Sequence, residues 1–373
     1  MSADRLENLA QTMLVAPGVT PAAVLSVGGR SGSGWRFATG AFGTRSTQRP
    51  ARVDPKTPFD LASVTKPVVA STIARLVRRG LFGFQTPLEV LLPALRGTAT
   101  GPLPLELLLA HRAGLDAHRA LYAELAAGGS VDPDAMLVAA AEARRDDCAG
   151  SPPDEGFPPL YSDMGYLLAG AAVARACGEP LERIVARETS DALGIDVASS
   201  NDWRARDATF DDTVAPTEIV PWRGGELVGD VHDENAWAYS RRGTAGHAGL
   251  FGTAEHVARF GAAFLDALAG RDTAWLTPGE ASVLTRPRPL GTLRAGFDGR
   301  SSAGSAAGSA FGTHSFGHLG FTGTSLWCDP DASIVAVILT NRVNPTRDNI
   351  AIRSVRPRLH DALFTLAVNL GRT

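Results

Sequence analysis

The sequence predicts an α+β fold: an antiparallel sheet built from both ends of the chain and flanked by helices, with a mostly helical lobe inserted between those ends. β-Prone runs lie near each end, and the segment between them has helical periodicity. The length of 373 residues exceeds the size at which one hydrophobic core usually stops growing. We therefore expect a discontinuous α/β sandwich domain at residues 1–85 and 241–373, a mostly helical lobe at residues 86–240, and a cleft between them.

The amino-terminal end predicts a helix followed by a β-hairpin. Residues 4–14 have the spacing of apolar side chains that is typical of a helix. Residues 22–27 and 35–38 are apolar and β-prone, and the Gly-rich residues 28–34 separate them. Two such runs around a glycine-rich connection predict two paired strands.

The carboxy-terminal end predicts a second hairpin and a last helix. Residues 324–327 and 333–339 are β-prone, and the turn residues 329–331 (DPD) lie between them. Residues 356–369 then have helical periodicity. Because both ends supply hairpins, we expect them to share one sheet.

The middle of the chain predicts helices. Ala- and Leu-rich stretches with a helical period occupy residues 63–79, 104–110, 134–144, 164–177, 180–193 and 254–269. Residues 300–315 are small and Gly-rich, and a predicted strand follows at once, so we expect a flexible loop there.

Composition excludes several classes of protein. Hydrophobic residues make up 44% and charged residues 20%, without a long run of like charge, which argues against disorder, and the net charge of -3 argues against a nucleic-acid partner. No apolar run is long enough to span a membrane, and the acidic start (MSADRLE) does not resemble a signal peptide, so we expect a cytoplasmic protein. The three cysteines, Cys148, Cys177 and Cys328, are too few for a disulfide framework and are expected to be free thiols.

Ser63 and Lys66 form the first motif with chemical potential. They begin the helix predicted at 63–79, and residues three apart share one helix face, so the Lys66 amine can reach the Ser63 hydroxyl. Serine is a weak nucleophile until a base takes its proton, and burial in apolar surroundings can lower the pKa of an amine toward the working range. The helix start also offers a backbone N–H and partial positive charge to an oxyanion.

The alternative is a serine that caps the helix and a lysine on the protein surface, and Ser-x-x-Lys alone does not exclude it. Lysine usage favours catalysis. Lys56 and Lys66 are the only lysines among 36 basic residues, and the rest are arginines. Lysine can give up its proton when buried and arginine cannot, so a lysine in an arginine-rich chain indicates a need for that property.

Two further motifs follow in order, Tyr161-x-Asp163 and residues 317–323 (GHLGFTG). With them the sequence resembles the serine β-lactamase and penicillin-binding-protein superfamily, and most of all its branch of class C β-lactamase-like esterases and D-amino-acid peptidases. The likeness covers nearly the whole chain; further similar segments are 107–115, 231–236, 246–251 and 339–347. The resemblance implies a β-lactamase/transpeptidase-like fold and a serine hydrolase that forms an acyl-enzyme.

The resemblance also implies roles for individual residues. Tyr161 would share a proton with Ser63 and later protonate the leaving group. The backbone N–H groups of Ser63 and Phe321 would bind the oxyanion. The alternative for Tyr161 is a tyrosine that packs beside Met164 and Tyr166 with its hydroxyl in water.

Three positions of the motifs need separate interpretation. Asp163 stands where many relatives have Asn, and a carboxylate beside Lys66 would favour its ammonium form and leave Tyr161 as the working base. His318 replaces the usual lysine of the third motif, so it donates a hydrogen bond to substrate or to Tyr161, or only shapes the strand. Gly320 lets substrate approach the strand, or is a plain strand glycine at a bulge.

The loss of the third-motif lysine bears on the substrate. β-Lactams and D-Ala-D-Ala peptides carry a carboxylate that a permanent cation would bind, so the replacement favours esters or neutral acyl donors. We expect hydrolysis of a small-molecule ester, amide or β-lactam through an acyl-serine, with an esterase favoured. The alternatives are a β-lactamase or D-Ala-D-Ala carboxypeptidase, an acyltransferase, and a penicillin-binding sensor that is acylated once without turnover.

The remaining histidines do not predict a metal site. His232, Asp233 and Glu234 are adjacent and His247 follows, but the sequence lacks a histidine pair at helical ligand spacing and a cysteine pair. We expect His111, His232 and His247 to form loop hydrogen bonds and cleft-wall contacts, and we expect no metal and no cofactor.

Overall fold

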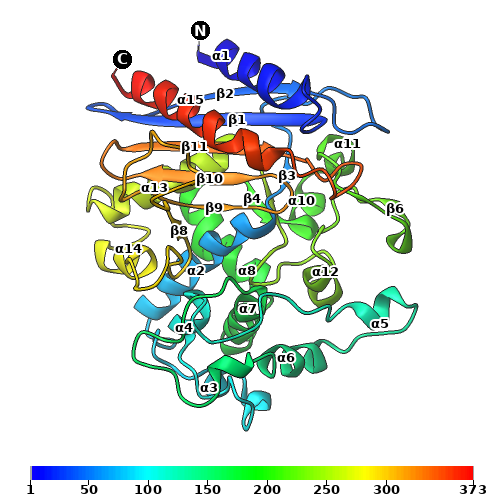
Figure 1. Ribbon diagram of the computed structural model, residues 1–373, viewed down its shortest axis with the longest axis vertical. Coiled ribbons are helices and arrows are strands. Elements are labelled where there is room, and N and C mark those ends of the chain that lie inside the picture. The colour runs from blue at the N-terminus through cyan, green and yellow to red at the C-terminus, as the bar shows by residue number, and fades with distance from the viewer. Residues whose placement is uncertain (1, 373) are drawn as a thin grey trace.

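A central six-stranded antiparallel sheet organises the computed structural model, which describes residues 2–372 (Figure 1). The strand order is β2-β1-β11-β10-β9-β8. The strands are β1 (Ala22–Ser31), β2 (Gly34–Gly43), β8 (Asp298–Gly299), β9 (Phe316–Leu319), β10 (Ser325–Asp329) and β11 (Ile334–Thr340). β1 pairs with β11 from Ala23 opposite Thr340 to Gly29 opposite Ile334, which confirms that the two chain ends share one sheet.

Helices cover both faces of this sheet. α1 (Ser2–Leu9) and α15 (Ile352–Arg372) lie on one face, and α13 (Ala254–Leu268) packs on the other (Figure 1). All seven residues of β11 are buried, as expected for a strand with helices on both sides. The predicted amino-terminal and carboxy-terminal helices and both hairpins are therefore confirmed.

The remaining helices lie mainly between the two sheet-forming ends. Their bounds are α2 (Thr65–Arg78), α3 (Leu88–Leu91), α4 (Leu105–Leu109), α5 (Ala123–Ala126), α6 (Pro133–Ala141), α7 (Asp163–Cys177), α8 (Leu181–Val185), α9 (Asp191–Leu193), α10 (Ser200–Arg206), α11 (Phe210–Thr213), α12 (Glu234–Ser240) and α14 (Pro278–Thr285). The helix predicted at 180–193 forms as α8 and α9 joined by a wider helical turn at residues 186–190. Residues 300–315 form the expected loop.

Short strands also occur within and beside the lobe. β3 (Phe59–Asp60), β7 (Leu250–Gly252) and β4 (Val197–Ser199) form a second sheet in that order, and β5 (Ile219–Val220) pairs with β6 (Gly225–Glu226). Because β4 pairs with β7, the second sheet joins the segment 86–240 to the residues that follow it. The division into two lobes at residues 86 and 240 stays a prediction.

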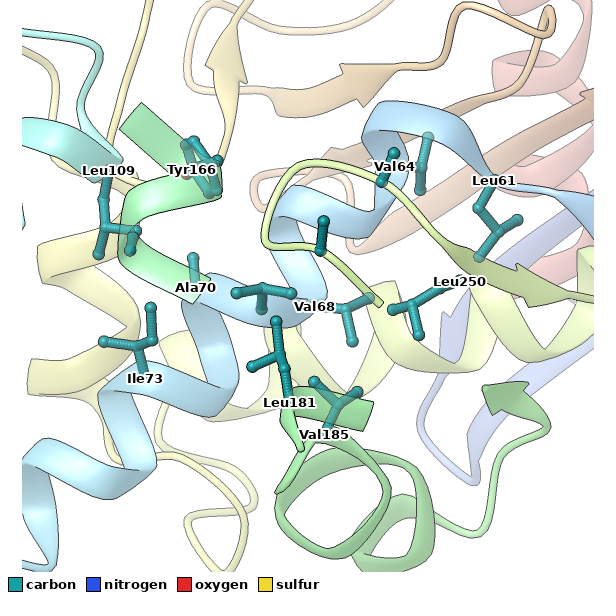
Figure 2. Close-up of a cluster of buried hydrophobic side chains, with 14 of the residues drawn as sticks. Leu61, Val64, Val68, Ala70, Ile73, Leu109, Tyr166, Leu181, Val185 and Leu250 are labelled. Carbon is teal, nitrogen blue, oxygen red and sulfur yellow. The ribbon is translucent and has the colours of Figure 1, made fainter. Parts of the chain in front are cut away.

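α2 is the helix that positions the first motif. Eleven of its residues are buried, among them Val68, Ala70 and Ile73, which contact side chains of the lobe, including Leu181 and Val185 of α8 (Figure 2). Gly80, in the left-handed conformation at φ 74°, follows the end of α2 as the sequence predicts. The start of α2 is thus held rigidly between the sheet and the lobe.

Cys148, Cys177 and Cys328 are free, as expected, with Cys177 partly exposed and the other two buried. Among the described residues 2–372, no helix has both the length and the apolar character that crossing a membrane requires.

Candidate active site

Ser63 lies in a tight helical turn, Ala62–Val64, directly before α2. Ala62 has a left-handed backbone (φ 47°), a conformation that costs energy for any residue but glycine. The buried Asp60 carboxylate holds this turn because it accepts the Ala62 N–H at 2.8 Å and the His232 N–H at 2.8 Å. The strained turn fixes the position of Ser63 at the wall of a cavity.

Lys66 is fully buried one turn further along, and its ammonium has three acceptors. Its Nζ donates to Ser63 Oγ at 2.8 Å, to Asp163 Oδ1 at 2.7 Å and to the His247 carbonyl at 3.2 Å. Three acceptors satisfy all three protons of an ammonium group. The arrangement excludes the alternative of a surface lysine.

Asp163 decides the charge of Lys66. Burial by itself lowers the pKa of the Lys66 amine, but the Asp163 carboxylate, the Tyr161 oxygen and the hydrogen bonds with both residues outweigh burial and raise that pKa above its usual value. Burial thus acts in the direction that the sequence suggests, but the net direction is upward, in agreement with the expectation that Asp163 favours the ammonium form. Lys66 is an ammonium at neutral pH, as the presence of Asp163 in the second motif indicates.

Tyr161 lies beside this ion pair, in the segment that leads into α7. The Lys66 Nζ is 4.8 Å from the centre of the Tyr161 ring, and the ring stacks on His111 at 4.6 Å. Burial raises the pKa of the Tyr161 phenol, although the charge of Lys66 and hydrogen bonding with Lys66 and Ser63 oppose the rise. The half-buried Tyr161 side chain lines the cavity, and its catalytic role stays a prediction.

His111 holds the second motif in place. The Ser162 N–H donates to His111 Nδ1 at 3.0 Å, so the imidazole proton must be on Nε2. Burial and the charge of Lys66 keep the pKa of His111 well below its usual value, and the ring is neutral. Loop hydrogen bonding is the use that the sequence predicts for this histidine.

His318 lies on β9 with its ring 5.9 Å from that of Tyr161. Burial and the Lys66 charge lower the pKa of His318 to about 3, so the ring is neutral at physiological pH. Its Nδ1 is 2.8 Å from the Leu319 carbonyl, which can only accept, so Nδ1 carries the proton and Nε2 is an acceptor. The third motif thus presents neither a cation nor an imidazole donor to the cavity.

The loop after β9 packs on the turn that carries Ser63. Thr322 Oγ1 donates to the Asp60 carbonyl at 2.8 Å, and Thr324 Oγ1 donates to the Leu61 carbonyl at 2.9 Å. A Cβ atom on Gly320 would collide with the Thr324 side chain and the Leu61 carbonyl. Glycine is therefore required there by the close approach of these two segments, whatever the substrate.

Phe321 follows, and its side chain is 48% exposed. One face of the ring stacks on His232 at 5.6 Å, and the Arg342 guanidinium is 4.6 Å from the ring centre. Within residues 2–372 the Phe321 N–H has no hydrogen-bond partner, which leaves it available to an oxyanion.

One cavity of about 610 Å³ unites these residues. Its lining includes Ser63, Tyr161, Asp163, His318, Gly320 and Phe321, with Lys66 directly beneath Ser63. The structure thus brings together every site residue that the sequence predicts, and their catalytic roles stay predictions.

Four arginines of the same cavity are not indicated by any motif of the sequence. They are Arg342, Arg347, Arg353 and Arg356. Arg342 and Arg347 belong to residues 339–347, one of the segments that resemble the family. Nothing in the pattern of this segment indicates that its side chains line the cavity.

His232 and His247 contribute to the wall of the site. His232 Nε2 is 3.0 Å from a Glu218 carboxylate oxygen, and His247 Nε2 is 2.9 Å from Asp233 Oδ1. Asp233 also caps α12 by accepting the Ala236 N–H. Among residues 2–372 there is no group of three or more His, Cys, Asp or Glu side chains arranged to hold a metal ion.

The fold and the placement of the motifs are those of β-lactamase/transpeptidase-like proteins: a helix-flanked antiparallel sheet with Ser-x-x-Lys at the start of a buried helix. The beta-lactamase family matches residues 17–357, and the chain belongs to that family. The resemblance that the motifs indicate is therefore confirmed.

Relatives differ in the reactions that their names describe. The chain is 27% identical over 323 residues to an N-acetylmuramyl-L-alanine amidase of Bacillus subtilis (strain 168), which is 80% of this chain and 71% of that protein. It is 28% identical over 197 residues to a putative D-alanyl-D-alanine carboxypeptidase of Salmonella agona (strain SL483), which is only 49% of this chain and 45% of that protein.

Solved structures of low sequence identity share the fold. EstCE1, a hydrolase with promiscuous acyltransferase activity, has a TM-score of 0.69 at 21% identity, covering 95% of this chain and 97% of that one. The simvastatin synthase LovD of Aspergillus terreus, in a mutant form, has a TM-score of 0.68 at 18% identity, with 98% and 96% covered.

Proposed function

We propose that the chain hydrolyses an ester or amide through an acyl-Ser63 intermediate. The observation that supports this most is the buried Lys66 ammonium, which joins Ser63 Oγ to Asp163 at the wall of a cavity. An ordinary structural lysine would not be buried beneath a cavity with its proton directed at a serine oxygen. Family membership supports the same class of reaction.

Acylation starts from the form of the site in which one proton has left and Tyr161 is a phenolate beside the Lys66 ammonium. Because Lys66 donates to Ser63 Oγ, the hydroxyl proton of Ser63 is free to point toward Tyr161. Ser63 Oγ bonds to the acyl carbon while its proton moves to the Tyr161 oxygen. The Ser63 and Phe321 N–H groups would bind the oxyanion.

The tetrahedral intermediate then loses its leaving group. Tyr161 returns its proton to the departing alkoxide or amine, which restores the phenolate and leaves the acyl-Ser63 ester. Deacylation follows the same two steps with water as the nucleophile. Water gives a proton to Tyr161 as it attacks the acyl carbon, and Ser63 Oγ takes that proton when the ester bond breaks. Lys66 keeps its charge throughout and stabilises the phenolate.

Two substrate classes have specific support. The acceptor nitrogen of His318 suits a neutral donor such as an N–H or O–H of the substrate, which agrees with an esterase that accepts neutral acyl groups. The amidase and carboxypeptidase relatives and the cavity arginines favour an anionic amide substrate as the second candidate.

The first experiment is steady-state hydrolysis of a short p-nitrophenyl ester by the native protein and by Ser63→Ala, with a chromogenic cephalosporin and a muramoyl-L-alanine amide in parallel. We expect repeated turnover that is lost in Ser63→Ala. Faster turnover of the cephalosporin or of the amide would identify the β-lactamase or the amidase alternative. Equal rates in both proteins would show that Ser63 is not the nucleophile.

Product stoichiometry distinguishes a sensor from an enzyme, and the rate of deacylation distinguishes an acyltransferase from a hydrolase. A sensor releases one equivalent of product and stops, whereas an enzyme continues. An acyltransferase loses its acyl group faster when an alcohol or amine is added, and a strict hydrolase does not.

A further inference from the structure

Three guanidinium groups lie together in the cavity that Ser63 lines. We call Arg342, Arg353 and Arg356 the arginine cluster; the first lies in the tail after β11 and the other two on α15. Within residues 2–372, none of the three forms an ion pair with a carboxylate. The neighbouring Arg347 differs, because it pairs with Glu218 and Glu234.

Arg356 is the most costly member of the cluster to bury. It is 6% exposed, its Nη2 donates to the Thr324 carbonyl at 3.3 Å, and its buried Nε has no hydrogen-bond partner in the described part of the chain. A buried charge normally has an opposite charge beside it, since desolvation is otherwise uncompensated. Arg356 instead has Arg342 and Arg353 as its charged neighbours.

The other two arginines have no carboxylate hydrogen-bonded to them within the described residues, and Glu218 attracts Arg342 only from a greater distance. Arg342 Nε donates to the Phe321 carbonyl at 2.8 Å, and its Nη1 donates to the carbonyls of Arg347 and Asn349, which are neutral acceptors. Arg353 is exposed, and its side chain has no hydrogen bond within residues 2–372.

Several carboxylates of the cavity already have partners. Asp163 pairs with Lys66, Asp233 with His247, and Glu234 with Arg347. Asp298 also lines the cavity, but it forms no ion pair with Arg342, Arg353 or Arg356 within the described residues. The arginine cluster is therefore an anion site that the protein's own carboxylates leave unpaired.

We propose that the arginine cluster binds a carboxylate of the substrate. The cluster lies in the same cavity as Ser63 and contacts the loop at Phe321 and Thr324, so one molecule can reach both. Guanidinium groups bind carboxylates through paired hydrogen bonds. The cluster would supply the cation that the neutral His318 does not. This inference rests on the proposed acyl-serine chemistry and names the substrate class for it.

Two matched pairs of esters test the proposal and locate the carboxylate. For the acyl side, the 4-nitrophenyl monoester of glutaric acid is compared with 4-nitrophenyl pentanoate. For the leaving-group side, 3-carboxy-4-nitrophenyl butanoate is compared with 4-nitrophenyl butanoate. We expect the carboxylate to raise kcat/KM by about tenfold or more in one of the pairs, and expect this preference to fall as salt is added.

Variants on α15 assign the effect. Arg353→Gln removes the charge of an exposed side chain and should reduce the preference for the carboxylate-bearing ester several-fold. Arg356→Lys keeps a buried cation but removes the planar guanidinium group that can form paired hydrogen bonds with a carboxylate. The matched control is Arg358→Gln, which makes the same charge change at an exposed position outside the cavity and should keep the native preference. Circular dichroism melting checks that each variant folds.

The outcomes separate this inference from the function that it rests on. Ser63-dependent turnover with equal kcat/KM in both ester pairs would overturn the anion subsite and leave the hydrolase intact. The anion subsite would also be overturned if Arg353→Gln and Arg358→Gln reduced the preference for the carboxylate-bearing ester equally. The effect would then come from the net charge of the protein. If inorganic phosphate raised the melting temperature through the cluster without any carboxylate preference, the site would bind a free anion and not substrate.

Discussion

A single ion pair sets the chemistry of the site at the residue scale. Asp163 lies 2.7 Å from the Lys66 ammonium and raises the pKa of Lys66 despite its complete burial. The same carboxylate adds to the rise in the pKa of Tyr161 that burial causes. Lys66 and Tyr161 are therefore both protonated in the resting site, and the proposed mechanism requires one of these protons to leave.

Asp163→Asn should move the acidic limb of the pH–rate profile to lower pH. Removing the carboxylate charge lowers the pKa of both Lys66 and Tyr161, so the form with one proton less appears at lower pH, by about one unit or more. The measurement is kcat/KM for a neutral ester against pH. Asp116→Asn, at a partly exposed carboxylate that pairs with Arg119, is the control and should keep the native limb. An unchanged profile in Asp163→Asn would remove Asp163 from the proton network.

A pair of tyrosines separates catalysis from packing. Tyr161→Phe keeps the aromatic ring but removes the proposed proton carrier, so kcat should fall by about 10²–10⁴-fold. Tyr166→Phe removes a hydroxyl that is buried without a partner in the described residues, so its melting temperature should stay the same or rise while activity is retained. Equal losses of activity in the two variants would indicate a packing effect, and native activity in Tyr161→Phe would exclude Tyr161 as the base.

At the scale of elements, the site depends on how the β9–β10 connection meets the turn before α2. Thr322 and Thr324 fasten this connection to the carbonyls of Asp60 and Leu61. The contact sets the distance between the Ser63 and Phe321 N–H groups, which come from segments more than two hundred residues apart in the sequence. The geometry of the proposed oxyanion site thus follows from the docking of two loops.

Gly320→Ala should disrupt this docking. The added Cβ has no room against the Leu61 carbonyl, so we expect a loss of about 1–3 kcal/mol in the free energy of unfolding together with reduced kcat. Denaturant unfolding and ester turnover measure the two effects. Gly32→Ala, in the β1–β2 turn where a Cβ meets nothing within 4 Å, is the matched control. Native stability in Gly320→Ala would contradict the assigned contact.

At the scale of the whole molecule, one continuous core connects the sheet with the helices of the lobe. It includes Val24 of β1, Val68 of α2, Leu168 of α7, Phe264 of α13 and Val337 of β11. The pairing of β1 with β11 closes the two ends of the chain onto each other.

Because these elements share a core, we expect a single cooperative unfolding transition. Tryptophan fluorescence and far-ultraviolet circular dichroism should give the same denaturant midpoint, since neither the sheet nor the lobe can lose its packing without exposing the apolar surface of the other. Two resolved transitions, or midpoints that differ between the two probes, would show that the lobe unfolds independently.

The sequence by itself determined the features that depend on local spacing and on ordered motifs. The three-residue separation of Ser63 and Lys66, the turn residues 329–331 and the helical periods predict their elements correctly, because these features depend on neighbours along the chain. The first hairpin forms as predicted, but its turn is residues 32–33 and not the whole Gly-rich stretch 28–34, since residues 28–31 belong to β1. The motifs around Tyr161 and His318 identify the superfamily. Tertiary structure decided the charge of Lys66, the neutral acceptor form of His318, the packing need for Gly320 and the arginine cluster. These properties arise from burial and from charges on segments distant in sequence, and electrostatic interactions depend on distance in space, which no periodicity encodes.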